Sequence, residues 1–309
     1  MQKRLKIGTR ESQLAVWQAT TVKNLLAENG VEAELVYIKS EGDIDLTTPL
    51  YEMGVTGVFT RSLDIALLNK SIDIAVHSMK DVPTQLPKGI VQSAVLQRGS
   101  HKDIFVFNGT AIDDVDFIHQ HTNAIIATSS IRRKAQWLQR FPNDIIENLR
   151  GNVNTRLRKV NESNWRGAIF AAAGLERIQL RPENSVDLDW MLPAPAQGAV
   201  MVVCRLEDDY CLQACAPLNH ATTATCVKIE RDFLRTLMGG CSTPISAYAS
   251  LINETIAFEG NIVSPNGDSI VSIEKNIPLE AAEEAGSILA KELLHNGAQA
   301  IVDKMNHAK

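Results

Sequence analysis

Asp73-Ile-Ala-Val-His-Ser-Met-Lys-Asp-Val-Pro83 is the most informative stretch of this sequence. Its apolar run, Ile74 to Val76, has the length and residue types of a short, fully buried strand. Side chains able to do chemistry follow directly: His77, Ser78, Lys80 and Asp81. Pro83 then forces Val82 out of helical geometry. Because ligands of open α/β sheets bind beyond the carboxyl ends of the strands, the stretch predicts an α/β fold with a ligand site here.

The adjacent Lys80 and Asp81 are the candidates for chemistry within this stretch. A carboxylate can accept and donate protons, and a neighbouring cation tends to keep it ionised. The alternative is a solvated turn with an incidental ion pair, which is the better interpretation of an isolated Lys-Asp dipeptide. The elements predicted on either side favour the site.

The residues before this stretch predict alternating strands and helices. Arg4 to Gly8 is a strand, a helix with one apolar face ends at Asn29-Gly30, and Ala33 to Ile38 is a second strand. The polar stretch Ser40 to Gly57 has no usable period, so we expect a loop, and loops of this length are often lids. A helix beginning near Phe59 leads back to the opening stretch.

The middle of the chain repeats this pattern. Strands are predicted at Ile104 to Phe107, Ala124 to Ala127 and Ala168 to Ala171. Pro193-Ala-Pro-Ala-Gln-Gly198 then breaks the chain before another strand, Ala199 to Cys204, which is expected to rejoin the first sheet.

Two predicted helix N-termini are candidates for anion binding. Ser12, with Arg10 beside it, begins the first helix, and Thr128-Ser-Ser130 begins a helix that carries Arg132 and Arg133. The N–H groups and the dipole of a helix N-terminus favour anions. For Ser12, simple N-capping is an equally good interpretation.

The last third of the chain predicts a small α+β domain. A helix spans Ala221 to Met238, alternating strands begin at Ile245, and a closing helix from Pro278 to Leu294 is stopped by Asn296-Gly297. The predicted domains are residues 1–98 with 199–216, residues 103–194, and residues 220–309.

Composition gives the general class of the protein. Of 309 residues, 45% are hydrophobic and 22% charged, as in ordinary globular proteins. No signal peptide and no bilayer-length apolar run is recognisable, which predicts a cytoplasmic protein without a membrane segment. The fold needs no partner to bury its core, so we expect a monomer. Five cysteines, an odd number, argue against a disulfide framework, and without a CxxC pair no metal site is expected.

Charge is unevenly distributed along the chain. The net charge of −5 argues against a general nucleic-acid binder. Between Ile131 and Arg177, however, ten basic residues stand against four acidic ones. Arginine forks at the ends of elements suit the capture of carboxylate or phosphate groups. A solvated basic face would account for about half of these residues, and nucleic-acid binding through the region is the less favoured alternative.

Seven motifs together resemble the porphobilinogen deaminase (hydroxymethylbilane synthase) family from near residue 5 to the end of the chain. Each motif is weak alone, but all seven in the family's order are very specific. They are Thr9-Arg-Glu-Ser-Gln-Leu-Ala-Val-Trp-Gln18, Ala75-Val-His-Ser-Met-Lys-Asp-Val-Pro83, Thr128-Ser-Ser-Ile-Arg-Arg133, Leu149-Arg-Gly-Asn-Val-Asn-Thr-Arg156, Ala172-Ala-Gly-Leu-Glu-Arg177, Pro195-Ala-Gln-Gly-Ala199 and Gly239-Gly-Cys-Ser-Thr-Pro244.

The resemblance implies an enzyme that condenses porphobilinogen units head to tail, with loss of ammonia, into a linear tetrapyrrole. It implies two domains like those of periplasmic binding proteins around a cleft, plus a smaller cofactor-bearing domain. It also implies a dipyrromethane cofactor joined through a thioether to Cys241, which the residues alone would suggest is an inert packing cysteine. Asp81 matches the family's catalytic carboxylate, which manages protons and stabilises the cationic intermediate.

Further positions match the family's binding residues. The resemblance implies cofactor contacts from Ser78, Lys80, Thr128, Ser129, Ser130, Arg132, Arg133 and Gly198. It implies substrate contacts from Arg10, Ser12, Phe59, Arg150, Asn152, Arg156, Arg177 and Gln197. Since each pyrrole carries an acetate and a propionate, donors of this kind suit the growing polyanion.

The lid region departs from the family pattern over residues 43–58. Glu52 and Thr56 replace the two usual lysines, and Val55 replaces a glycine. We expect Glu52 to face solvent or a basic residue, because it would repel a substrate carboxylate. The altered lid leaves an inactive relative as one alternative. A non-catalytic two-lobed solute-binding protein is another, although it would not explain Gly239-Gly-Cys241.

Overall fold

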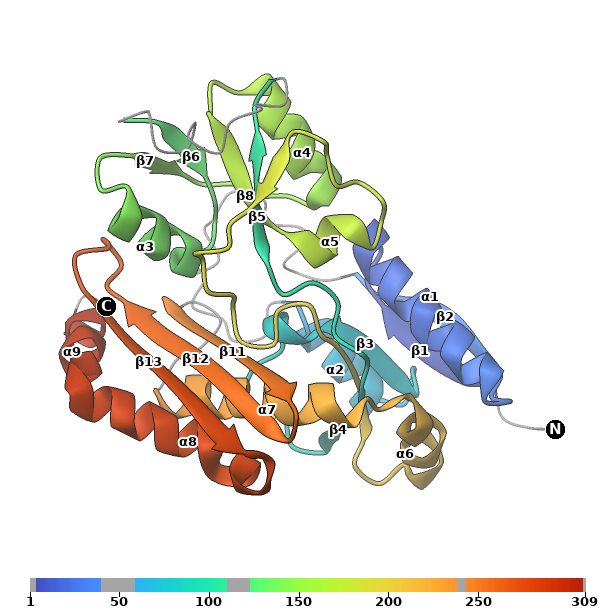
Figure 1. Cartoon of the computed structure of the whole chain (residues 1–309). Coiled ribbons are helices and arrows are strands. Elements are labelled where there is room, and N and C mark those ends of the chain that lie inside the picture. The colour runs from blue at the N-terminus through green and yellow to red at the C-terminus, as the bar shows by residue number, and fades with distance from the viewer. Residues whose placement is uncertain (1–3, 40–58, 110–122, 238–242, 308–309) are drawn as a thin grey trace.

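The computed structural model describes residues 4–39, 59–109, 123–237 and 243–307. Three sheets organise these residues: two mixed five-stranded sheets and one antiparallel three-stranded sheet (Figure 1). We call the first two, with their helices, lobe 1 and lobe 2, and the third the C-terminal domain. The predicted fold class, two α/β lobes and a small α+β domain, is confirmed. Within the described ranges, every helix is too short or too polar to span a lipid bilayer.

Lobe 1 has the strand order β2-β1-β3-β10-β4. Its strands are β1 (Leu5–Thr9), β2 (Ala33–Tyr37), β3 (Ile74–Ser78), β4 (Ile90–Val95) and β10 (Val200–Arg205). β10 enters antiparallel between β3 and β4, so the predicted return of the chain to the first sheet is confirmed. Ser78 pairs with Val200, which brings the end of β3 to the start of β10.

Apolar side chains on both faces of this sheet explain its layers. Helices α1 (Gln13–Glu28) and α6 (Asp209–Cys215) share a buried core with one face. Helix α2 (Arg61–Leu68) covers the other face. β3 is buried on both sides, as the run from Ile74 to Val76 predicted.

Lobe 2 repeats this plan with the order β7-β6-β8-β5-β9. Its strands are β5 (Asp103–Phe107), β6 (Ile125–Ala127), β7 (Ile145–Glu147), β8 (Gly167–Ala171) and β9 (Ser185–Asp187). Helix α3 (Ile131–Arg140) packs with one buried cluster of the sheet, and α4 (Val153–Glu162) and α5 (Ala172–Glu176) pack with the other. β5 runs antiparallel to β8, so each lobe contains one reversed strand next to its central one.

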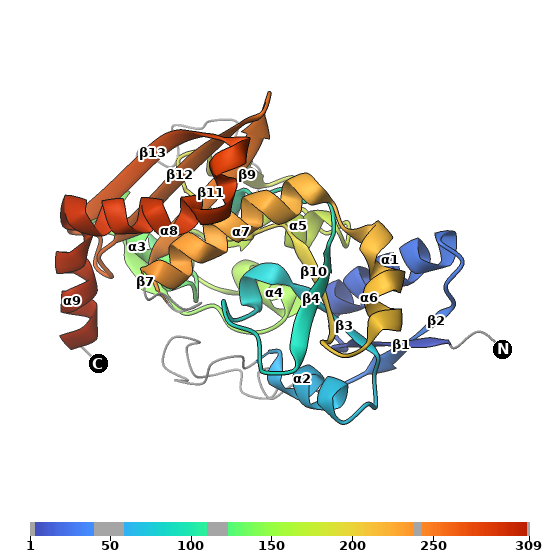
Figure 2. The ribbon, with the colours of Figure 1, turned by 90° about the horizontal axis from the view of Figure 1, so that it is seen from below.

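In the C-terminal domain, helices pack on an antiparallel sheet. Its elements are α7 (Ala221–Thr236), β11 (Ile245–Ile252), β12 (Thr255–Val263), β13 (Ile270–Pro278), α8 (Ala282–Leu293) and α9 (Gln299–His307). Figure 2 shows α7 and α8 side by side along the sheet, with α7 facing lobe 1.

The closing helix begins later than predicted, ends within one residue of its predicted end, and is followed by a further helix. Strand β13 continues to Pro278, because the nine-residue β12 offers it partners as far as Thr255. At the other end, Gly297 adopts a φ of 111° and forms a wide turn, after which the chain continues as α9. Glycine in this conformation usually ends a helix, and here a second helix follows it.

The two segments that connect the lobes lie against each other. The Gly99 N–H donates to the Gly198 carbonyl at 3.0 Å. Gly198 has a φ of +84°, and a Cβ there would lie 2.5 Å from the Ser100 carbonyl oxygen. Only glycine fits this position, for conformational and for steric reasons.

Glu230 of α7 links the two interlobe segments to the C-terminal domain. Its fully buried carboxylate accepts two hydrogen bonds from the Arg98 guanidinium, at 2.6 and 3.1 Å. It also accepts from the Ala196 N–H at 2.6 Å and from the Ala249 N–H at 2.8 Å. One side chain therefore ties both interlobe segments to strand β11.

We expect Glu230→Gln to destabilise the protein by about 3 kcal/mol, because it leaves the Arg98 charge buried without its counter-ion. Glu34→Gln is the matched control, since its pair with Arg4 is exposed and should be worth less than about 1 kcal/mol. Thermal unfolding of both variants measures the difference. Equal melting temperatures would contradict the role of Glu230.

Candidate functional site

The carboxyl end of β3 forms the centre of the candidate site. The strand ends at Ser78, and a single 3-10 turn, Met79–Asp81, follows it. The Met79 N–H donates to the Ala199 carbonyl at 3.0 Å, which fixes the start of the turn against β10. Lys80 and Asp81 are both half-buried on this turn. The sequence therefore located the turn and its two charged side chains correctly.

A hydrogen-bonded chain leads from Lys80 into lobe 2. Lys80 Nζ donates to Gln197 Oε1 at 3.2 Å, and Gln197 Nε2 donates to Asp103 Oδ1 at 2.9 Å. Gln197 also donates to the His101 carbonyl at 2.7 Å. Gln197 is fully buried, so its amide is held in one orientation between the lobes.

Asp103, the first residue of β5, holds two of the predicted arginines. Its Oδ2 accepts from Arg132 at 2.7 Å, and its Oδ1 accepts from Arg133 at 2.7 and 3.0 Å. Arg132 also donates to the Leu192 carbonyl, and Arg133 to the Ile169 carbonyl. Burial alone would raise the pKa of Asp103, but the two guanidinium groups hold it well below its usual range. This carboxylate stays ionised and keeps both arginines beside Lys80.

Positive charge accumulates where the lobes meet. Burial and the Arg133 guanidinium lower the pKa of Lys80 to about 8, against the opposing effect of Asp81. Burial, Arg133 and Arg150 lower the pKa of Arg156 to about 10, again opposed by Asp81. Cations whose pKa is lowered by other cations mark a place where an anion would be stabilised. Lys80 and Asp81 come from lobe 1, and the three arginines come from lobe 2.

Arg10, Phe59 and Arg177, three of the predicted substrate contacts, are held by aromatic and backbone groups. The Arg10 guanidinium lies over the Phe59 ring, 4.5 Å from its centroid. Arg177 donates to the Gly198 carbonyl at 2.6 Å and lies over Trp17 of α1. The contact between Arg177 and Trp17 joins α1 to lobe 2.

Several predicted hydroxyl and amide side chains cap helices. Ser12, Ser130 and Asn152 are the N-caps of α1, α3 and α4. The Thr128 hydroxyl accepts from the Ser130 N–H at 3.2 Å, and the Ser129 hydroxyl donates to the Leu149 carbonyl. The capping alternative considered for Ser12 is therefore present, and the helix N-termini of α3 and α4 are both rigidly defined.

Neighbouring side chains complete the β3 end. Ser78 Oγ accepts from Gln18 Nε2 at 2.8 Å. His77 is buried, and burial together with the Arg10 charge lowers its pKa to about 4. A neutral imidazole therefore lies next to the charged turn. Cys241 and the predicted lid, residues 43–58 with Glu52 and Thr56, lie outside the described residues.

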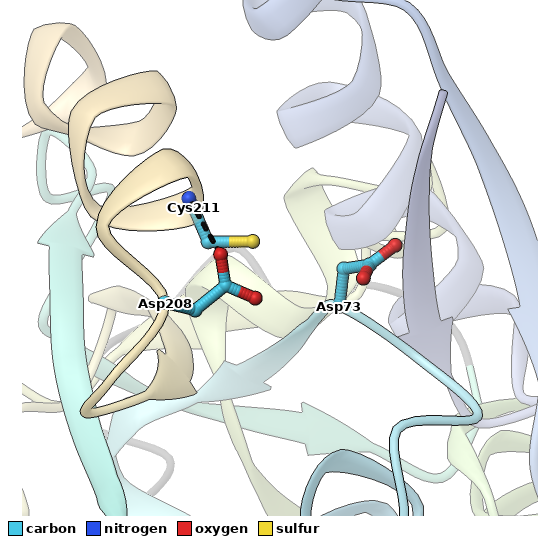
Figure 3. Close-up of side chains that lie close together, drawn as sticks. All are labelled: Asp73, Asp208 and Cys211. Atoms are coloured by element: carbon cyan, nitrogen blue, oxygen red, sulfur yellow. Dashed lines mark hydrogen bonds between the residues drawn. The ribbon is translucent and has the colours of Figure 1, made fainter. Parts of the chain in front are cut away.

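One cluster outside this site has the composition of a metal site. Asp73, Asp208 and Cys211 bring two carboxylates and a thiol close together (Figure 3). The Arg205 guanidinium, however, forms ion pairs with both carboxylates and donates to the carbonyls of Leu67 and Ile72. An arginine already neutralises this cluster, so we assign it a structural role.

Sequence reasoning missed Asp103, Arg98 and Glu230. Asp103 directly precedes the apolar run Ile104 to Phe107, and an acidic residue at this place indicates a buried cationic partner. Glu230 lies on the apolar face of α7 among Val227, Phe233 and Leu234, which is a comparable signal. The arginine partners of Asp103 and Glu230 are distant in the sequence, so these ion pairs could not be predicted from it.

Comparison with known families and structures gives a consistent result. Residues 5–213 match the family model described as porphobilinogen deaminase, dipyrromethane cofactor binding domain. Residues 224–295 match the model of the porphobilinogen deaminase C-terminal domain. Among solved structures, the chain is similar to an ancestral cationic amino acid solute-binding protein (16% identity, 70% of this chain and 87% of that chain, TM-score 0.44). It is also similar to the methionine-binding protein MetQ (13% identity, 70% and 89%, TM-score 0.44).

Proposed function

This chain belongs to the porphobilinogen deaminase family, and on that premise we propose that it is a hydroxymethylbilane synthase. The family is a transferase family of tetrapyrrole synthesis that uses a dipyrromethane cofactor. The proposed reaction joins porphobilinogen units head to tail. At each step the aminomethyl C–N bond breaks, ammonia leaves, a C–C bond forms, and the attacked ring carbon loses its proton. Hydrolysis finally releases the linear tetrapyrrole.

The observation that carries this proposal is the meeting of the Lys80–Asp81 turn with the arginines of lobe 2. Lys80 is linked through Gln197 to Asp103, which binds Arg132 and Arg133. Burial and the neighbouring Arg133 lower the pKa of Arg156, and the Asp81 charge opposes this. Two carboxylates, Asp81 and the buried Asp103, thus lie among several cations at the interlobe junction. This combination suits a substrate that carries carboxylates and becomes cationic as it reacts.

The residues at this junction fit a dipyrromethane cofactor. A cofactor made from two substrate units carries their acetate and propionate groups, and these anions would relieve the repulsion between Arg133, Arg150 and Arg156. Lys80, Arg132 and Arg133 would hold them. When bound, the cofactor supplies the ring to which the first substrate is added.

The chain's own residues then have defined tasks in the reaction. The Asp81 carboxylate would stabilise positive charge on the substrate pyrrole as ammonia departs, and it would take up and return protons at its Oδ atoms. Arg10, Arg156 and Arg177 would orient the substrate carboxylates. The buried amide of Gln197 would keep Lys80 directed towards lobe 2.

The chemistry of the other cysteines supports attachment at Cys241. The described cysteines, Cys204, Cys211, Cys215 and Cys226, are all buried. Burial raises the pKa of Cys204, Cys215 and Cys226 to about 11, and it raises that of Cys211 as well. Few of these thiols would be ionised at neutral pH, and the thiolate is the nucleophile. A cytoplasmic location and a monomeric state remain predictions.

Turnover of the purified protein tests the proposal directly. Incubation with porphobilinogen should release ammonia in an amount equal to the substrate consumed, with a linear tetrapyrrole as product. Intact mass should exceed that of the bare chain by the cofactor. A protein that binds porphobilinogen without releasing ammonia would instead be the inactive relative or the non-catalytic binding protein considered above.

We expect cofactor uptake by the cofactor-free protein to depend on the charge of Lys80. Since its pKa is about 8, the ammonium loses its proton as pH rises through that value, and attraction for cofactor carboxylates weakens. In Lys80→Arg the charge persists across this range. The ratio of wild-type to variant uptake rates should therefore fall between pH 7 and 9.5, and comparison with the same variant cancels the titration of the acceptor thiol. A pH-independent ratio would contradict this role.

A further inference from the structure

Arg231 of α7 contacts the backbone on both sides of the Lys80–Asp81 pair. Its Nη1 donates to the Met79 carbonyl at 3.2 Å and to the Val82 carbonyl at 2.9 Å, and its Nη2 donates to the Pro83 carbonyl at 2.6 Å. The first of these carbonyls precedes the charged pair and the other two follow it. A single guanidinium from another domain therefore spans the turn.

The turn itself has few internal bonds. Within it, the Val82 N–H donates to the Met79 carbonyl at 3.1 Å, and the Met79 N–H donates to Ala199 at its start. A single 3-10 turn of this kind has weaker hydrogen-bond geometry than an α-helix. Charged donors form stronger hydrogen bonds than neutral ones, so Arg231 contributes a large share of the turn's fixed contacts.

Helix α7 is in turn fixed to two cores. Val227 packs in a core of lobe 1, and Phe233 packs in the core of the C-terminal domain. The helix ends at Thr236, shortly before Cys241 in the sequence. The same helix thus contacts the turn that carries Asp81 and leads directly to the segment that carries the proposed attachment thiol.

We propose that Arg231 is a positioning residue, which sets the Asp81 carboxylate relative to helix α7 and the C-terminal domain. This rests on the proposed function above. It acts through backbone carbonyls and touches no reacting atom. Arg231 therefore determines how well Asp81 is aligned, while the cofactor and the substrate are held by other residues.

Arg231→Ala removes all three contacts, and Arg231→Lys retains a charged donor with a smaller reach. Arg235→Ala is the matched control: Arg235 lies one turn further along α7, is about half exposed and pairs with Asp232. The measurements are kcat, KM, intact mass, melting temperature, and amide hydrogen exchange of a peptide covering residues 79–84.

For Arg231→Ala we expect kcat to fall at least about tenfold, because small misplacements of a reacting group are costly. KM should stay within about twofold of wild type and the cofactor mass should be retained, because no binding contact is removed. Peptide 79–84 should exchange faster, Arg231→Lys should recover part of kcat, and Arg235→Ala should match wild type.

Three results would overturn the proposal. The first is equal kcat in the Arg231 and Arg235 variants, the second is unchanged exchange in peptide 79–84, and the third is a loss of kcat that occurs only with loss of the cofactor. If Arg231→Ala fails to fold, Arg231→Lys decides by the same criteria. If wild-type protein shows no turnover, the proposed function fails, while the exchange comparison still decides whether Arg231 positions the turn.

Discussion

Asp81→Ala is expected to retain the fold and the cofactor and to lose nearly all turnover. General acid–base groups of this kind contribute about 100- to 10,000-fold in rate, and we expect kcat to fall within that range. The Asp81 side chain is half-buried at the end of a surface turn, so its removal leaves the cores of lobe 1 intact. Steady-state kinetics and intact mass on the same sample measure both parts of the expectation.

Two further variants sharpen this result. Asp81→Asn keeps the shape of the side chain and removes its charge, so it should be almost as inactive as Asp81→Ala. Glu207→Gln removes an exposed carboxylate elsewhere in lobe 1 and should leave kcat unchanged. Substantial turnover in either Asp81 variant, with the cofactor in place, would remove Asp81 from the mechanism.

Cys241→Ala is expected to give a protein of bare-chain mass that makes no tetrapyrrole. The reason is chemical, because a thioether requires a thiol that can ionise and be reached, and alanine offers no nucleophile. The fold should persist, because the substitution removes a single sulfur atom from the chain. Mass spectrometry of the purified variant, before and after incubation with porphobilinogen, is the measurement.

Cys204→Ala provides the matched control for this expectation. Cys204 is buried in β10, and its pKa of about 11 keeps its thiol protonated. The control should therefore carry the full covalent mass. An adduct that persists in Cys241→Ala and disappears in Cys204→Ala would refute the assignment, as would tetrapyrrole synthesis by a Cys241→Ala protein of bare-chain mass.

Much of the fold was predictable because its central strands are strongly apolar and short. The run Ile74 to Val76 and the strand from Ala199 have no competing helical period, so their burial and their ends were predicted closely. Strands β7 and β9, with three residues each, were not predicted. The equally short β6 was predicted, because Thr128-Ser-Ser130 marks its end. Helix α4 follows Asn152 and was likewise not assigned, although its N-cap is typical.

In the candidate site, too, local features could be predicted from the sequence and long-range contacts could not. The charged turn was evident from local sequence, because the strand end, the proline and the reactive residues are adjacent. The partners that fix its charges were not, because Asp103 meets Arg132 and Arg133 across 29 and 30 residues and Arg231 meets Met79 across 152. Contacts between charged groups that are distant in the sequence produce no periodic pattern from which they could be predicted.

The place of β10 between β3 and β4 has a consequence for the order of biosynthesis. A nascent chain that has reached residue 199 already contains every strand of lobe 2, while the sheet of lobe 1 still lacks the strand between β3 and β4. The synthesis of lobe 1 therefore begins before that of lobe 2 but is completed after it. Ala199, whose carbonyl accepts the hydrogen bond from the Met79 N–H, leaves the ribosome after the strands of lobe 2.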